Sequence, residues 1–129
     1  SYGLGETIVQ GSVNPDEYLV FKPTLRDGFR PILRRRIGTK EFKLVYSKAG
    51  GKQTETVAVP EADRTRLSLR DDEVLELARW ASIIEQHYTG LRGAACPMDI
   101  EWALEEGSRR LYILQARPET VRSRESGLT

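Results

Sequence analysis

The stretch PMDIEWALEEGSRRLYILQARP, from Pro97 to Pro118, has the pattern of a β-hairpin. Residues 98–104 and 111–117 are rich in aliphatic and aromatic side chains, as strands are, and the polar run 105–110 between them suits a turn. We therefore expect two antiparallel strands here. The way in which they pair decides which side chains of this segment can meet.

Side chains alternate along each predicted strand, so Asp99 and Glu101 share one face of the first strand. On the second strand, four residues are expected to share a face: Leu111, Ile113, Gln115 and Arg117. A turn with an odd number of residues, centred on Ser108, would pair Glu101 with Gln115 and Asp99 with Arg117. A turn one residue shorter or longer would send the polar groups of the two strands to opposite sides.

Such a face has two interpretations. Glu101 and Gln115 would offer Mg²⁺ two of the hard oxygen ligands it prefers, leaving its other positions to water and substrate phosphate. Arg117 would present a fork of N–H donors to a phosphate beside that metal. The alternative is a solvated face on which an exposed ion pair between Asp99 and Arg117 contributes about 0–1 kcal/mol. The residue types alone leave both interpretations open.

Composition sets limits on the class of protein. The chain has 129 residues, with 20 Lys and Arg against 19 Asp and Glu, so it suits one domain or a piece of one and has no overall field to attract nucleic acid. Its single cysteine, Cys96, excludes a disulfide within the chain. No apolar run reaches the roughly 18 residues of a membrane span, and the first residues show no signal-peptide pattern. We expect a soluble cytoplasmic protein without a membrane partner.

Elsewhere the chain alternates between strand patterns and turns. A strand-like segment is expected at the start, further strands at 17–22, 31–37, 41–46 and 54–59, and a turn at Gly50 and Gly51. The one long helix is expected from Asp71 to about Tyr88, with its apolar stripe on the sheet. These elements predict an α+β fold in which one long helix lies across a face of an antiparallel sheet.

Five blocks of the sequence carry a resemblance to a known family. They are GLGE at 3–6, VNPDEY at 13–18, VPEADR at 59–64, PMDIEW at 97–102 and LYILQARPETV at 111–121. In the same order, they resemble the nucleotide-binding domain of phosphoenolpyruvate synthase, a family related to pyruvate phosphate dikinase and, more distantly, to rifampicin phosphotransferase. The resemblance spans nearly the whole chain.

The resemblance implies that residues 1–121 are the C-terminal portion of an ATP-grasp-like domain in a longer enzyme, and that 122–129 form a polar tail or the start of a linker. The family converts ATP, pyruvate and water into phosphoenolpyruvate, AMP and phosphate. The phosphate passes from this domain through a phosphohistidine domain to a pyruvate-binding domain. The implied partners are therefore ATP, Mg²⁺ and those two domains, and a homo-oligomer of the full enzyme stays open.

Carried over residue by residue, the resemblance implies that Glu101 and Gln115 hold Mg²⁺ and that Arg117 grips the transferring phosphate. Asp99 would orient Arg117 or reach the metal through water. Gly5 and Glu6 would contact the nucleotide. A lysine and further arginines of the family's site lie before residue 1, so we expect the isolated chain neither to turn over nor to bind ATP tightly.

Three points stay open beside this interpretation. Residues 89–96 depart from the family pattern as an insertion between helix and hairpin, which could loop outward or shift the metal geometry. The run Arg34 to Arg36 is expected to be a solvated strand edge, and it offers a second hypothesis, a non-catalytic module that holds a partner by charge. A third keeps the nucleotide domain but changes the acceptor, as in the related dikinases and antibiotic phosphotransferases.

Overall fold

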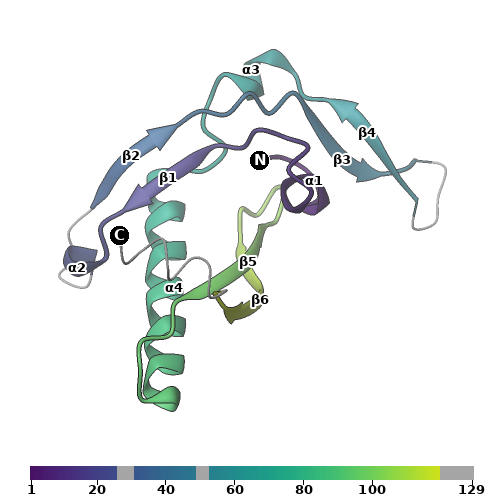
Figure 1. The fold of residues 1–129 in the computed structure, drawn as a ribbon. Coiled ribbons are helices and arrows are strands. Elements are labelled where there is room, and N and C mark those ends of the chain that lie inside the picture. The colour runs from purple at the N-terminus through teal and green to yellow at the C-terminus, as the bar shows by residue number, and fades with distance from the viewer. Residues whose placement is uncertain (26–30, 49–52, 120–129) are drawn as a thin grey trace. The chain divides into compact units, whose positions relative to one another are not determined.

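The computed structural model describes residues 1–25, 31–48 and 53–119 (Figure 1). The chain divides into two compact units, which are described separately. Unit 1 is Ser1–Phe21 with Pro31–Asp71, and unit 2 is Lys22–Arg30 with Asp72–Thr129. The predictions of a turn at Gly50 and Gly51 and of a polar tail at 122–129 lie outside the described residues.

Unit 1 contains two antiparallel strand pairs and two short helices (Figure 1). Its elements are α1 (Glu6–Val9), β1 (Glu17–Val20), β2 (Ile32–Arg36), β3 (Phe42–Tyr46), β4 (Thr54–Ala58) and α3 (Glu61–Arg64). Strand β1 pairs with β2, and β3 pairs with β4. The four predicted strands are therefore confirmed, with ends that differ by one or two residues.

Two predictions about the strands are wrong. The described strands form three separate two-stranded sheets, not one sheet, although the α+β class is confirmed. The strand-like start is a helical turn instead, because the amides of Ile8 and Val9 both donate to the carbonyl of Gly5, at 3.1 and 3.2 Å. Thr7 is the buried residue of that turn. The strand prediction rested on only three residues, 7–9, and so short a segment cannot distinguish a strand from a helix.

A buried ion pair joins distant segments of unit 1. The side chains of Lys40 and Asp16 are 0% and 1% exposed, and the Lys40 ammonium donates to Asp16 at 2.5 Å. It also donates to the carbonyls of Gly38, at 3.1 Å, and Arg64, at 3.0 Å. Asp16 in turn accepts the backbone N–H groups of Gly38, at 2.8 Å, and Ser68, at 2.7 Å. Other groups of unit 1 thus form hydrogen bonds with both charged side chains, so we assign the ion pair a structural role.

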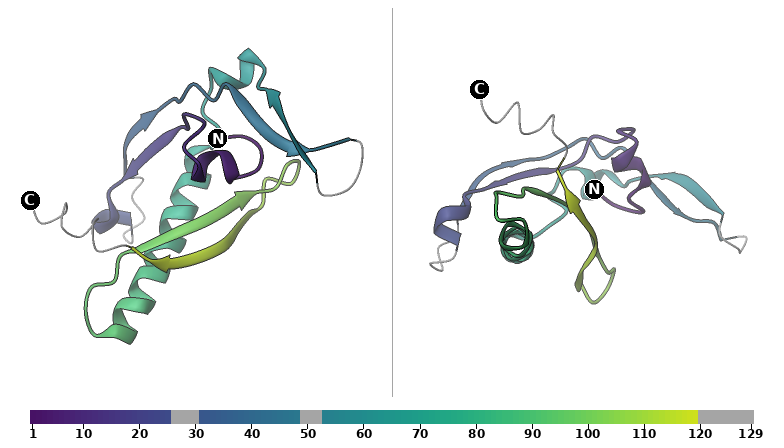
Figure 2. Two further views of the ribbon diagram at one scale, coloured as in Figure 1. Left: turned by 45° about the vertical axis from the view of Figure 1, so that its right-hand side comes forward. Right: turned by 60° about the horizontal axis from the view of Figure 1, so that its bottom comes forward.

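Unit 2 carries the long helix and the hairpin. Its elements are α2 (Lys22–Leu25), α4 (Asp71–Arg92, whose first residue closes unit 1), β5 (Met98–Leu104) and β6 (Leu111–Pro118). Figure 2 shows α4 and the β5–β6 ribbon from two further sides. The predicted helix is confirmed, but it runs four residues beyond Tyr88 and ends before Gly93, whose φ is +68°. None of the helices in the described ranges is long and apolar enough to cross a membrane.

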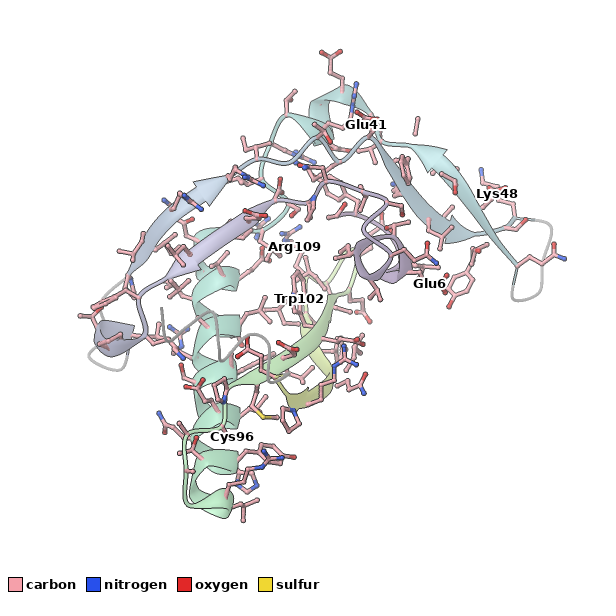
Figure 3. All side chains as sticks on the ribbon, in the orientation of Figure 1. Glu6, Glu41, Lys48, Cys96, Trp102 and Arg109 are labelled. Atoms are coloured by element: carbon pink, nitrogen blue, oxygen red, sulfur yellow. The ribbon has the colours of Figure 1, made fainter. Side chains whose placement is uncertain are left out.

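The extra turn of α4 lies within residues 89–96, the segment predicted to be an insertion. Thr89, in that turn, accepts the backbone N–H of Cys96 through its hydroxyl at 3.1 Å. Cys96 is buried, and its sulfur lies 3.8 Å from that of Met98 at the start of β5 (Figure 3). Residues 89–96 therefore extend the helix and pack back onto the base of the hairpin.

Candidate functional site

The β5–β6 hairpin brings the predicted site residues together. The strands are antiparallel, and Glu101 lies opposite Gln115 while Asp99 lies opposite Arg117. The amide of Glu119 donates to the carbonyl of Pro97 at 2.9 Å, which continues the ladder past the strand ends. Both predicted cross-strand pairs are confirmed.

The turn and the strand pairing that produce this register differ from the predicted ones. Near the turn, Leu104 pairs with Leu111, so the connection has six residues and is not centred on Ser108. Trp102 pairs with Ile113, whereas the preceding residue of β5, Glu101, pairs with Gln115, so Leu114 is left without a partner on β5. This β-bulge shifts the register by one residue. It restores the polar pairs that an even turn alone would have separated.

The bulge also reassigns faces on β6. The prediction that Leu111, Ile113, Gln115 and Arg117 share a face is wrong, because Leu111 and Ile113 pair with residues of the other face of β5. We define the polar face as the side that carries six residues: Asp99, Glu101, Ala103, Tyr112, Gln115 and Arg117. The opposite side carries the aliphatic residues, of which Leu111 is buried. Tyr112 is an addition to the face that the sequence did not predict.

The groups on the polar face are available to a ligand. Asp99, Glu101, Gln115 and Arg117 are exposed, and none of them forms a hydrogen bond or ion pair with another residue in the part of the chain described. The ion pair between Asp99 and Arg117, which the alternative interpretation required, is not seen there. A carboxylate and an amide oxygen from directly opposite positions fit Mg²⁺, which takes few protein ligands and keeps room for water and phosphate.

Within the described ranges, no group of three or more His, Cys, Asp or Glu side chains could hold a metal by itself. The Glu101–Gln115 pair includes an amide and has two members, so it would hold a cation only together with water or substrate oxygens. That is the arrangement expected for a metal that arrives with a nucleotide.

The turn of the hairpin is fixed by residues that sequence reasoning missed. Arg109 donates from two nitrogens to the carboxylate of Glu73, at 2.8 and 2.6 Å, and thereby joins the turn to the first part of α4 (Figure 3). Arg109 has a φ of +54°, and its amide donates to the carbonyl of Glu105 at 2.9 Å. A basic turn and an acidic helix start are both visible in the sequence, but their contact is not.

Gly5 and Glu6 occupy unit 1. Gly5 precedes α1 and Glu6 is its first residue, and both are exposed. The four polar-face residues named above belong to unit 2, so a nucleotide contact of Gly5 or Glu6 stays a prediction.

A hollow of about 330 Å³ lies elsewhere in unit 1. It is lined by residues 11–15 together with Thr39, Glu41 and Phe42. Among these lining residues Glu41 carries the single charge, and a lone carboxylate repels phosphate. The hollow is therefore a poorer candidate for nucleotide phosphates than the polar face.

The arginine run of β2 is exposed along its length, as predicted for a strand edge. Arg35 makes a bidentate contact with Asp71, at 2.9 and 2.6 Å, and Arg36 contacts Glu17 at 3.1 Å. Two of the three positive charges are thus compensated within unit 1. The hypothesis of a charge-driven interaction module rests mainly on Arg34 and is correspondingly weaker.

Comparison with known proteins finds similar sequences in one enzyme family. Residues 1–128 match the family described as pyruvate phosphate dikinase, AMP/ATP-binding domain. The chain is 57% identical over 126 residues to a phosphoenolpyruvate synthase of Synechocystis, covering 98% of this chain and 15% of that protein. Similar matches are the phosphoenolpyruvate synthases of Neisseria meningitidis, 52% identical over 129 residues (98% and 16%), and Escherichia coli, 48% over 126 residues (96% and 15%). The chain thus spans less than a fifth of the length of these relatives.

Proposed function

Because the chain belongs to the family of pyruvate phosphate dikinase AMP/ATP-binding domains, we propose that it forms part of an ATP-grasp-like nucleotide-binding domain in a phosphoenolpyruvate synthase. The full protein would convert ATP, pyruvate and water into phosphoenolpyruvate, AMP and phosphate. Phosphate would pass to a histidine on a second domain and then to pyruvate on a third. The pairing of Glu101 with Gln115 and of Asp99 with Arg117 on one exposed face carries this proposal.

In the proposed mechanism the polar face binds the phosphate end of the nucleotide. Glu101 and Gln115 would hold Mg²⁺, which when bound neutralises charge on phosphate oxygens. Arg117, two residues beyond Gln115 on the same face, would donate hydrogen bonds to the transferring phosphate and stabilise the charge that develops on it. Asp99, opposite Arg117, would orient its guanidinium or bind the metal through water. Gly5 and Glu6 are proposed to contact the nucleotide, as the resemblance implies.

Phosphoryl transfer depends chiefly on positioning and charge stabilisation, so removing one of these groups should stop the reaction without unfolding the protein. In the full-length protein that contains this chain, we expect Glu101→Ala and Arg117→Ala to abolish autophosphorylation by Mg-ATP. Matched controls are Glu106→Ala and Arg110→Ala, which remove the same kinds of charge from exposed positions of the hairpin turn. Normal phosphorylation of either site variant, with both controls active, would refute the assignment.

The isolated chain allows a second test. It spans less than a fifth of its relatives, and we propose that the nucleotide site needs groups from outside this chain. Isothermal titration of the 129 residues with Mg-ATP is expected to show no binding in the micromolar range. Micromolar binding by the chain alone would contradict a site shared with other parts of the protein.

A further inference from the structure

We infer that Tyr112 contacts the nucleoside part of the bound nucleotide, an inference that rests on the function proposed above. Tyr112 lies opposite Ala103, in the register position next to the Glu101–Gln115 pair and on the same face. Tyr112 and Gln115 are three residues apart, so regular alternation would place them on opposite sides. The bulge at Leu114 is what brings them to one side.

The polar face has an order along the hairpin. Arg117 and Asp99 lie at the open end, Gln115 and Glu101 come next, and Tyr112 lies one position nearer the turn. Same-face positions of a strand are about 7 Å apart, since the rise is about 3.3 Å per residue. A nucleotide whose terminal phosphate is at Arg117 and whose metal is at Glu101 would therefore extend its ribose and base toward Tyr112.

The chemistry at this position suits a flat, uncharged group. Tyr112 is 41% exposed, and in the described part of the chain its hydroxyl has no hydrogen-bond partner. Ala103 opposite it carries a single methyl group, so no long side chain lies directly across the strand pair from the ring. Aromatic rings stack on nucleobases without regard to base sequence, and removing one changes affinity by roughly 5- to 150-fold.

The structure also argues against a purely structural role for Tyr112. Its neighbours Leu111 and Ile113 supply the packing on the opposite side of β6, where Leu111 is buried. Trp102, the other partly exposed aromatic residue of the hairpin, is 39% exposed but lies on that apolar side (Figure 3). Tyr112 is thus the one aromatic residue of β5 and β6 that shares a face with the proposed metal and phosphate groups.

The test compares two ligands that differ in the nucleoside. In the full-length protein, binding of Mg-ATP and of Mg-tripolyphosphate is measured by titration calorimetry for Tyr112→Ala and Tyr112→Leu. We expect both variants to lose roughly tenfold in affinity for Mg-ATP and less than twofold for Mg-tripolyphosphate, while Tyr112→Phe keeps the affinity for both. The matched control is Tyr88→Ala, because Tyr88 is similarly exposed, at 36%, on α4.

The outcomes separate this inference from the proposed function. Unchanged Mg-ATP binding in Tyr112→Ala and Tyr112→Leu, or equal losses for the two ligands, would overturn the role of Tyr112. Arg117→Ala is measured in parallel and should weaken both ligands, since both carry the phosphate chain. If Arg117→Ala weakens both while the Tyr112 variants weaken neither, the proposed function stands and the nucleoside contact fails. If Arg117→Ala leaves both unchanged, the proposed phosphate site fails, and the Tyr112 inference fails with it.

Discussion

Two groups of charged side chains in this molecule differ in burial and in partners. In unit 1, the side chains of Asp16 and Lys40 are almost completely buried. Besides their ion pair, backbone N–H groups donate to the Asp16 carboxylate and backbone C=O groups accept from the Lys40 ammonium. On the polar face of unit 2, Glu101 and Arg117 are exposed and have no partner among the described residues. The first arrangement stabilises a fold, whereas the second leaves its binding capacity for a ligand.

Strong interactions within the protein are therefore a poor guide to the ligand-binding site. A buried pair cannot bind an incoming ligand without losing hydrogen bonds that the fold requires. Exposed groups can bind a ligand without such a loss, provided that the backbone holds them on the same face of the strand pair. In unit 2 the spacing of Gln115 and Arg117 along β6 keeps both on the polar face, so it is the feature to perturb first.

The largest effect is expected from deleting Ala116 in the full-length protein. Removal of this residue makes Gln115 and Arg117 neighbours on β6, so they can no longer both lie on the polar face. We expect autophosphorylation to fall by roughly 10² to 10³, the range seen when a charge-stabilising group is lost. Deletion of Leu114 is the control, because it also removes one residue but leaves a regular ladder in which Gln115 still lies opposite Glu101 and Arg117 opposite Asp99. An Ala116 deletion variant that stays as active as the Leu114 deletion variant would show that Gln115 and Arg117 need not share a face.

Replacing Lys40 by methionine should unfold unit 1 more readily. The change leaves the Asp16 carboxylate buried without its cationic partner, which costs about 3–5 kcal/mol. Chemical denaturation followed by circular dichroism measures the loss. Lys48→Met, at an exposed position of the same unit, should stay within about 0.5 kcal/mol of the original protein. Equal effects of the two substitutions would contradict a structural role for the pair.

An intermediate effect is expected at the contact between the hairpin turn and α4. Arg109→Ala removes a bidentate partner of the mostly buried Glu73 carboxylate and should lower the free energy of unfolding by about 1–3 kcal/mol. Arg109→Gly should cost up to about 1 kcal/mol less, since glycine relieves the left-handed backbone at this position. Denaturation midpoints of the two variants give the comparison. A glycine variant less stable than the alanine variant would show that the backbone at Arg109 is not strained.

The smallest effect is a pH dependence that comes from Asp16. Burial alone would raise the pKa of this carboxyl, but hydrogen bonds from Lys40, Gly38 and Ser68 outweigh it and hold the pKa below the ordinary value of 3.8. A carboxyl with a lowered pKa in the folded state stabilises the fold above its unfolded pKa, and the contribution is lost as the pH falls through the folded value. Unfolding free energies measured from pH 6 down to about pH 3 should therefore decrease. Asp16→Asn should show a shallower decrease, and an identical slope would contradict this assignment.

Sequence patterns predicted the elements more successfully than their assembly. Alternating aliphatic residues gave the strands of the hairpin, and helical spacing gave α4 from Asp71 onward. These patterns are local, so they required no knowledge of tertiary contacts. The separation into two-stranded sheets and the contact of Lys40 with Asp16, 24 residues away, depend on long-range packing that periodicity does not encode.

The bulge was predictable in part. On β6 the apolar residues Leu111 and Ile113 hold odd positions, as do the polar residues Gln115 and Arg117, so an unbroken strand would mix the two kinds on one face. Such a conflict signals an extra residue between Ile113 and Gln115. The sequence therefore contained the signal for Tyr112 on the polar face, but the predicted odd-numbered turn gave the correct Glu101–Gln115 pair without it.

The proposed function depends on Glu101 and Gln115 acting together on one cation that accompanies the nucleotide. A double-mutant cycle measures this cooperation, with the affinity of the full-length protein for Mg-ATP determined in Glu101→Ala, Gln115→Ala and the double variant. If both side chains hold the same ion across the strand pair, the second substitution should weaken binding much less than the first. Independent losses that add in the double variant, or no loss in either single variant, would refute a shared cation site.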